Sequence, residues 1–112
     1  MKRTLSALAL TLSCLGAAPA FAADAATTAI QAIAQVNGMA LACQQPAISS
    51  RARNAFATTA PKTRENGEIF EAASSAAYLE QGKGASCPDV ATFTRLLEAG
   101  EQGLQSAFRS PR

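Results

Sequence analysis

The residue types that most often carry enzyme chemistry are scarce in this chain. It contains three cysteines and no histidine, which excludes a histidine-activated nucleophile and removes the commonest metal ligand. No two cysteines form a Cys-x-x-Cys motif, so a thioredoxin-like redox centre is also excluded. The sequence therefore predicts neither a metal site nor a cofactor.

Carboxylates are the remaining candidates for general acid or base chemistry. Glu65, Glu68 and Glu71 stand three residues apart, and Glu98 and Glu101 repeat that spacing. Glutamates spaced this way on one helix are typical of a solvated face, whereas a catalytic pair needs a cleft that separates the two pKa values. We therefore predict no catalytic residue, with a carboxylate-based enzyme as the second alternative.

Four basic residues, Arg51, Arg53, Lys62 and Arg64, flank one expected turn. One interpretation is a solvated helix hairpin whose exposed ion pairs are each worth ~0–1 kcal/mol. The other is a binding patch for an acidic protein, an anionic lipid or a wall polymer. The nearby segment 82–86 (GKGAS) lacks the spacing of a phosphate-binding loop and indicates a flexible connection.

The chain begins with the pattern of a cleavable signal peptide. Lys2 and Arg3 precede an apolar run at 5–15, which is shorter than the roughly 20 residues that a membrane-spanning helix needs. Small residues at Ala20 and Ala22 match positions −3 and −1 of a cleavage site after Ala22, with a second candidate cut two residues earlier. The predicted organisation is a signal peptide at 1–22, a helical domain at 23–108 and a frayed tail at 109–112.

A lipoprotein is the alternative interpretation of this N-terminal region. A lipid-modified cysteine follows a short leucine-led box, but Leu12 stands one place too close to Cys14. Cleavage after Ala22 would instead leave a periplasmic or secreted protein without a stable membrane anchor.

Removing residues 1–22 changes the charge of the chain. Ten Lys and Arg residues fall to eight, which equals the eight Asp and Glu residues, so the mature domain has no formal net charge. Nonspecific nucleic-acid binding depends on cationic residues that release phosphate counterions. We therefore exclude nucleic acid as a partner.

The two cysteines left after cleavage, Cys43 and Cys87, predict one disulfide, because paired cysteines are typical of small exported domains. The closed loop of about 45 residues would destabilise the unfolded chain by roughly 4 kcal/mol.

The composition of the predicted domain favours helices. Alanine makes up about a quarter of it, whereas valine and aromatic residues, which favour strands, are few. Proline and glycine divide the domain into helices expected at 24–43, 47–60 (or 50–60), 64–81 and 88–108. The dipeptide Asn37-Gly38 either weakens the first helix or splits it with a turn.

Apolar residues at spacings of three and four mark the expected inner face of each helix. At the start of the fourth helix, Ser86 or Cys87 is the expected cap, Pro88 the first helical residue and Asp89 the charge that complements the dipole. The predicted inner faces comprise Ile33, Val36, Ala40 and Cys43; Ile48, Ala52, Ala55 and Phe56; Ile69, Ala72, Ala76 and Leu79, with Phe70, Ala73 and Ala77 beside them; and Val90, Phe93, Leu97, Gly100, Leu104 and Phe108, widened by Leu96.

These features together predict an all-α fold, either a small four-helix bundle or an orthogonal helical domain, closed by Cys43–Cys87. The expected function is that of a non-catalytic protein-binding or accessory factor of the cell envelope. Its expected partner is another envelope protein, or a second copy in a homodimer. In size, cysteine number and helix content the chain resembles periplasmic stress chaperones and toxin-immunity proteins, which are the alternatives, although no motif carries that likeness.

Overall fold

The computed structural model describes residues 17–109, with side chains from residue 25 onward. This part of the chain forms four helices and no strand, so the predicted all-α fold is confirmed. Most of the predicted signal peptide, residues 1–16, and the end of the predicted tail, residues 110–112, lie outside the described residues. The helices are α1 (Ala17–Ala42), α2 (Pro46–Thr59), α3 (Arg64–Gly82) and α4 (Val90–Ala107).

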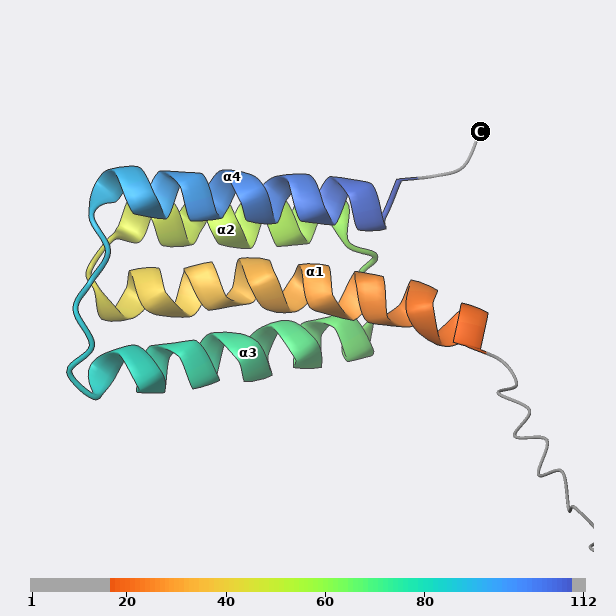
Figure 1. Ribbon diagram of the computed structural model, residues 1–112, viewed down its shortest axis with the longest axis horizontal. Helices are drawn as coiled ribbons and strands as arrows, with labels where there is room; N and C mark the ends of the chain where they lie inside the picture. Colours follow the sequence, from red (N-terminus) through yellow and green to blue (C-terminus); the bar gives the residue numbers. More distant parts are fainter. Residues whose placement is uncertain (1–16, 110–112) are drawn as a thin grey trace, which may run out of the picture.

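Helix α1 is the central element of the bundle. It packs against each of the other three helices, and α2 also packs against α4. Figure 1 shows α3 on one side of α1 and the α2–α4 pair on the other, with the N-terminal end of α1 extending beyond the bundle. Within the described residues, no helix is both long and apolar enough to cross a membrane.

The core surrounds α1, and its largest fully buried side chains come from α1 and α4. They are Ile30, Ile33, Phe93, Leu97 and Leu104. The predicted α4 face is confirmed at its centre, while Val90 and Leu96 are exposed. A Cβ atom on Gly100 would lie 2.9 Å from Cδ1 of Ile33, so this glycine allows the two helices to approach closely.

The dipeptide Asn37-Gly38 does not form a turn, because α1 continues through it to Ala42. Gly38 instead lies directly against α3, where a Cβ atom would overlap the carbonyl oxygen of Ser74 and lie 2.9 Å from the backbone nitrogen of Tyr78. Glycine at this position therefore permits a backbone-to-backbone helix contact.

The inner face of α3 differs from the predicted one. Phe70, Ser74 and Gln81 are its buried residues, whereas Ala72, Ala76 and Leu79, all predicted to be inside, are exposed. The buried positions follow spacings of four and seven, which also place them on one helix face. The prediction failed because the four alanines of this helix lie beside the buried face and not at its centre, while two of the buried residues, Ser74 and Gln81, are polar.

Polar side chains cap the N-terminal ends of two of the helices. Thr63 accepts a hydrogen bond from the backbone N–H of Asn66 at the start of α3, and Asp89 accepts one from that of Thr92 at the start of α4. The expectation that Ser86 or Cys87 caps α4 was wrong, because the carboxylate of Asp89 fills that role.

Proline and glycine also occur in or next to two of the connections between helices. Pro46 occupies the start of α2, where its missing N–H and fixed φ suit the first helical turn. After α3, Gly84 adopts a φ of 102°, which glycine tolerates and other residues rarely adopt.

Candidate functional site

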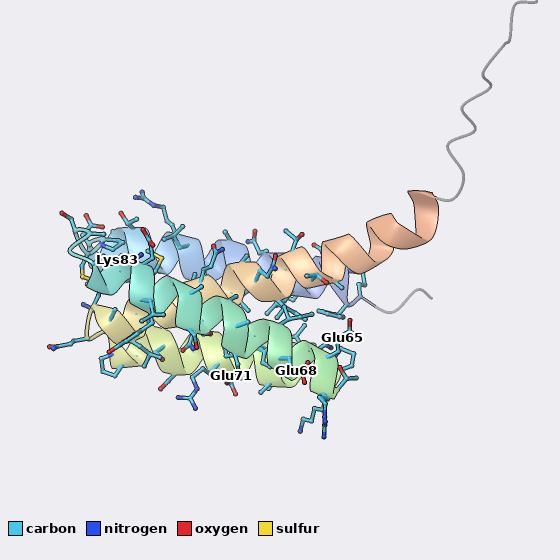
Figure 2. The ribbon with its side chains drawn as sticks, turned by 90° about the horizontal axis from the view of Figure 1, so that it is seen from below. Glu65, Glu68, Glu71 and Lys83 are labelled. Atoms are coloured by element: carbon cyan, nitrogen blue, oxygen red, sulfur yellow. A yellow bond between two sulfur atoms is a disulfide. The ribbon has the colours of Figure 1, made fainter. Side chains whose placement is uncertain are left out.

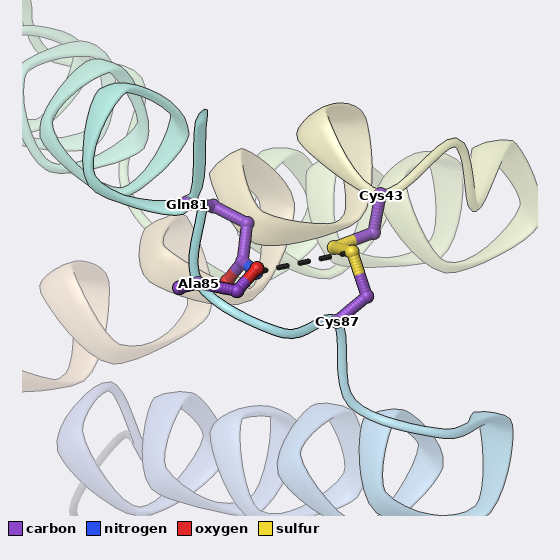
Figure 3. The surroundings of a disulfide bond; sticks show 4 residues. All are labelled: Cys43, Gln81, Ala85 and Cys87. Carbon is purple, nitrogen blue, oxygen red and sulfur yellow. Dashed lines mark hydrogen bonds between the residues drawn. A yellow bond between two sulfur atoms is a disulfide. The ribbon is translucent and has the colours of Figure 1, made fainter. Parts of the chain in front are cut away.

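The predicted disulfide is present between Cys43, just after α1, and Cys87, just before α4, with Cα atoms 5.8 Å apart. Gln81 supports it from α3, as Figure 3 shows. Its Nε2 donates to the backbone oxygen of Ala85 at 2.8 Å and to Sγ of Cys87 at 3.8 Å. The disulfide thus anchors the α3–α4 connection to the end of the central helix.

The four predicted patch residues face in different directions. Arg51 points toward α4, where its Nε and Nη2 atoms donate to the two carboxylate oxygens of Glu101 at 3.0 and 2.7 Å. This bidentate hydrogen bonding, together with the negative charge of Glu101, raises the pKa of Arg51. Arg53 lines a groove beside α3. Lys62 lies in the α2–α3 turn, and Arg64 is the first residue of α3. The binding of an acidic partner by all four cations stays a prediction.

The predicted carboxylate candidates are similarly dispersed. Figure 2 labels Glu65, Glu68 and Glu71 along α3, where all three are exposed. Glu101 is held by Arg51, and Glu98 is exposed on α4. Among the side chains that the structure describes, no three His, Cys, Asp or Glu residues gather into a group that could hold a metal ion.

Of the segment 82–86, Gly82 ends α3 and residues 83–86 lie in the connection that follows it. Lys83, labelled in Figure 2, lies 3.5 Å from the carboxylate of Glu80 and is exposed. This exposed ion pair contributes at most ~1 kcal/mol, so Lys83 is a surface residue at the C-terminal end of α3.

A groove of about 480 Å³ lies between α2 and α3 and has residues of α1 in its lining; we call it the α2–α3 groove. Its buried lining residues are Asn37, Phe70 and Ser74. Asn37 of α1 accepts a hydrogen bond from the Ser49 hydroxyl of α2 at 2.7 Å and donates one to the Ser74 hydroxyl of α3 at 3.1 Å. Buried hydrogen bonds therefore join three helices beneath the groove.

Two further contacts fix the geometry of the α2–α3 groove. The Ser74 hydroxyl donates to the backbone oxygen of Ala34 at 3.1 Å, so α3 is held directly to the α1 backbone. Phe56 of α2 stacks on Phe70 of α3, with ring centroids 4.4 Å apart. The aromatic pair and the buried hydrogen bonds together make the groove a preformed feature of the bundle.

The rim of the α2–α3 groove is apolar and exposed. Leu41 of α1 is 47% exposed, and Tyr78 and Leu79 of α3 are 49% and 64% exposed. They are three of the five large hydrophobic residues exposed in the described part of the chain; the others are Val90 and Leu96 of α4. Single exposed apolar residues need no explanation, whereas a gathered set is typical of an interaction surface.

The α2–α3 groove also carries one charge of each sign. Arg53 lies on the α2 side and Glu71 on the α3 side, and neither forms a salt bridge among the described residues. Both side chains are exposed and are therefore available to groups of opposite charge on a partner.

A larger hollow of about 590 Å³ lies elsewhere between α1 and α3. Gln35 and Met39 of α1 and Ala73 and Ala77 of α3 contribute to its lining. None of the five large exposed hydrophobic residues belongs to it. Volume alone does not identify a binding site, so we take the α2–α3 groove, with its apolar rim and two charges, as the candidate site.

Sequence reasoning assigned Arg53 to a patch and Glu71 to a solvated face but did not bring them together. It placed Leu79 inside the bundle and gave Leu41 and Tyr78 no role. The buried Asn37 was the available signal, since an asparagine in an apolar helix face needs polar partners from neighbouring helices.

Comparisons of the chain with protein-family models, with curated proteins and with solved structures find no match.

Proposed function

We propose that this protein is exported and acts as a non-catalytic protein-binding or accessory factor of the cell envelope. The observation that carries the binding function is the α2–α3 groove, because Leu41, Tyr78 and Leu79 leave apolar surface exposed around a preformed, hydrogen-bonded floor. Protein interfaces bury apolar and aromatic side chains at their centre and keep polar groups at the rim. Arg53 and Glu71 supply such polar groups here.

Two features support export to an oxidising compartment. The Cys43–Cys87 disulfide is compatible with the periplasm or the extracellular medium and is uncommon in cytosolic proteins. The N-terminal pattern of two basic residues, a short apolar run and Ala20 and Ala22 matches a secretory signal. Mass spectrometry of the mature chain tests this part, and a start at Ala23 is the expected result.

The binding function is tested by affinity capture from envelope extract with three forms of the full chain. Leu79→Glu places a charge on the groove rim, whereas Val90→Glu makes the same kind of change at an apolar residue on α4 of similar exposure, 60% against 64%. We expect the wild type and Val90→Glu to retain the same stoichiometric protein and Leu79→Glu to lose it. Equal capture by both variants would refute a role for the groove.

The identity of the captured proteins separates the alternatives. One stoichiometric toxin-like partner would support an immunity protein. Many unfolded proteins, retained only after acid treatment, would support a stress chaperone. Substrate turnover that is lost when a single glutamate is replaced would contradict the non-catalytic proposal.

A further inference from the structure

The α2–α3 groove carries charges of opposite sign on its two sides. Arg53 and Glu71 lie on its two sides and form no salt bridge within the described residues. Both belong to the same stretch of the groove. Arg53 lies in α2 between Ser49 and Phe56, and these two residues contact the α1–α3 side of the bundle at the buried hydrogen bonds and the aromatic stack. Glu71 directly follows Phe70 in that stack.

We infer that a second copy of this chain covers the α2–α3 groove, forming a dimer whose two-fold axis runs along the groove. Such an axis places the α2 side of each copy opposite the α3 side of its partner. Arg53 of each copy then faces Glu71 of the other, so two equivalent ion pairs form at once. The inference rests on the groove identified in the proposed function and names a second copy of the chain as the protein that binds there.

The apolar rim supplies the rest of this interface. Leu41, Tyr78 and Leu79 are 47%, 49% and 64% exposed in one chain. Tyr78 and Leu79 belong to α3, so the two-fold axis places them against the α2 side of the partner, and the interface covers both sets. Dimer interfaces are more apolar than the remaining protein surface. A chain of this size also buries a limited share of its unfolded surface by itself, and much of its interior is alanine. Association through the groove would extend the core across the two copies.

Charge reversal tests the pairing directly in the full chain with its disulfide intact. The molecular mass of wild type, Arg53→Glu, Glu71→Arg and the double variant is followed by sedimentation across a concentration series. Each single reversal creates two like-charge contacts, so we expect it to weaken dimerisation by about tenfold or more. The double variant exchanges the two charges and should regain the dimer affinity of the wild type.

Two matched controls address general charge and folding effects. Arg95→Glu and Glu98→Arg make the same changes at exposed positions of α4 that do not line the groove, and both should leave dimerisation unchanged. Leu79→Glu should give a monomer with the helical circular dichroism of the wild type, which separates loss of association from loss of fold.

Several outcomes would overturn the inference. These are a wild type that stays monomeric up to about millimolar concentration, a double variant no tighter than the single ones, or a dimer that Leu79→Glu leaves intact. A monomer that still captures an envelope protein through the groove would reject the dimer and retain the proposed function. A groove-dependent dimer that captures no envelope protein would retain the dimer and reject the proposed binding of an envelope protein.

Discussion

Gly38 of α1 lies directly against the backbone of α3, and adding one methyl group there tests this contact. In Gly38→Ala, the new Cβ atom would overlap the carbonyl oxygen of Ser74 and lie 2.9 Å from both the Tyr78 backbone nitrogen and the Ala77 Cβ atom. Two of these three neighbours are backbone atoms, so no side-chain rotation relieves the overlap. Helix α3 must move away from α1.

The size of the effect follows from two opposing contributions. Alanine is a better helix former than glycine by about 1 kcal/mol, which favours the variant. Overpacking a tight contact costs about 1–3 kcal/mol and sometimes more. Moving α3 also stretches the adjacent hydrogen bond from Asn37 to Ser74, which is worth about 1 kcal/mol. We therefore expect a net loss of about 2 kcal/mol in the free energy of unfolding.

Urea unfolding followed by circular dichroism measures this loss, and a second glycine provides the control. A Cβ atom on Gly103 of α4 would meet nothing within 4 Å, so Gly103→Ala should gain up to about 1 kcal/mol from helix propensity alone. For a domain of this size, each kcal/mol moves Tm by about 4–8 °C. A Gly38→Ala protein as stable as the wild type would refute the backbone contact.

Three further predictions concern the groups that join the helices. Asn37→Ala should cost about 1–3 kcal/mol, because the buried Ser49 hydroxyl loses its acceptor; combining it with Ser49→Ala should give a non-additive loss in urea unfolding. Reducing the disulfide Cys43–Cys87 should lower the free energy of unfolding by roughly 4 kcal/mol, which thermal melts with and without reductant will measure. The hydrogen bonds at the α4 cap lower the pKa of Asp89, so its stabilising effect is present above the unfolded pKa of about 4 and is lost as pH falls through the lower folded value. Asp89→Asn keeps a capping oxygen, and its acid titration by circular dichroism should lack that component.

The success of sequence reasoning differed among the helices for a physical reason. In α4, phenylalanine and leucine stand against polar neighbours, so the spacing of Phe93, Leu97 and Leu104 identified the buried face. In α3, four alanines lie beside the buried face, and a serine and a glutamine are buried on it. Their burial depends on hydrogen-bond partners from other segments, which a local pattern does not contain.

Only part of the candidate site could be predicted from the sequence, for a similar reason. The pairing of Cys43 with Cys87 followed from a count of cysteines. The α2–α3 groove depends instead on the packing of three helices, which brings Arg53 and Glu71 to the lining of one hollow. It depends also on the exposure of Leu79, which apolar periodicity assigned to the interior.

Helix α3 packs closely against one helix, α1, and this has a consequence for hydrogen exchange. Among the described helices, α2 reaches α3 through side chains such as Phe56, whereas α1, α2 and α4 pack against one another as a connected set. Amides in the middle of α3 should therefore exchange through a local opening of lower free energy than those of α1. The short turn from α2 and the disulfide at residue 87 tie both ends of α3 down, so this opening would bow the helix outward while its ends stay attached.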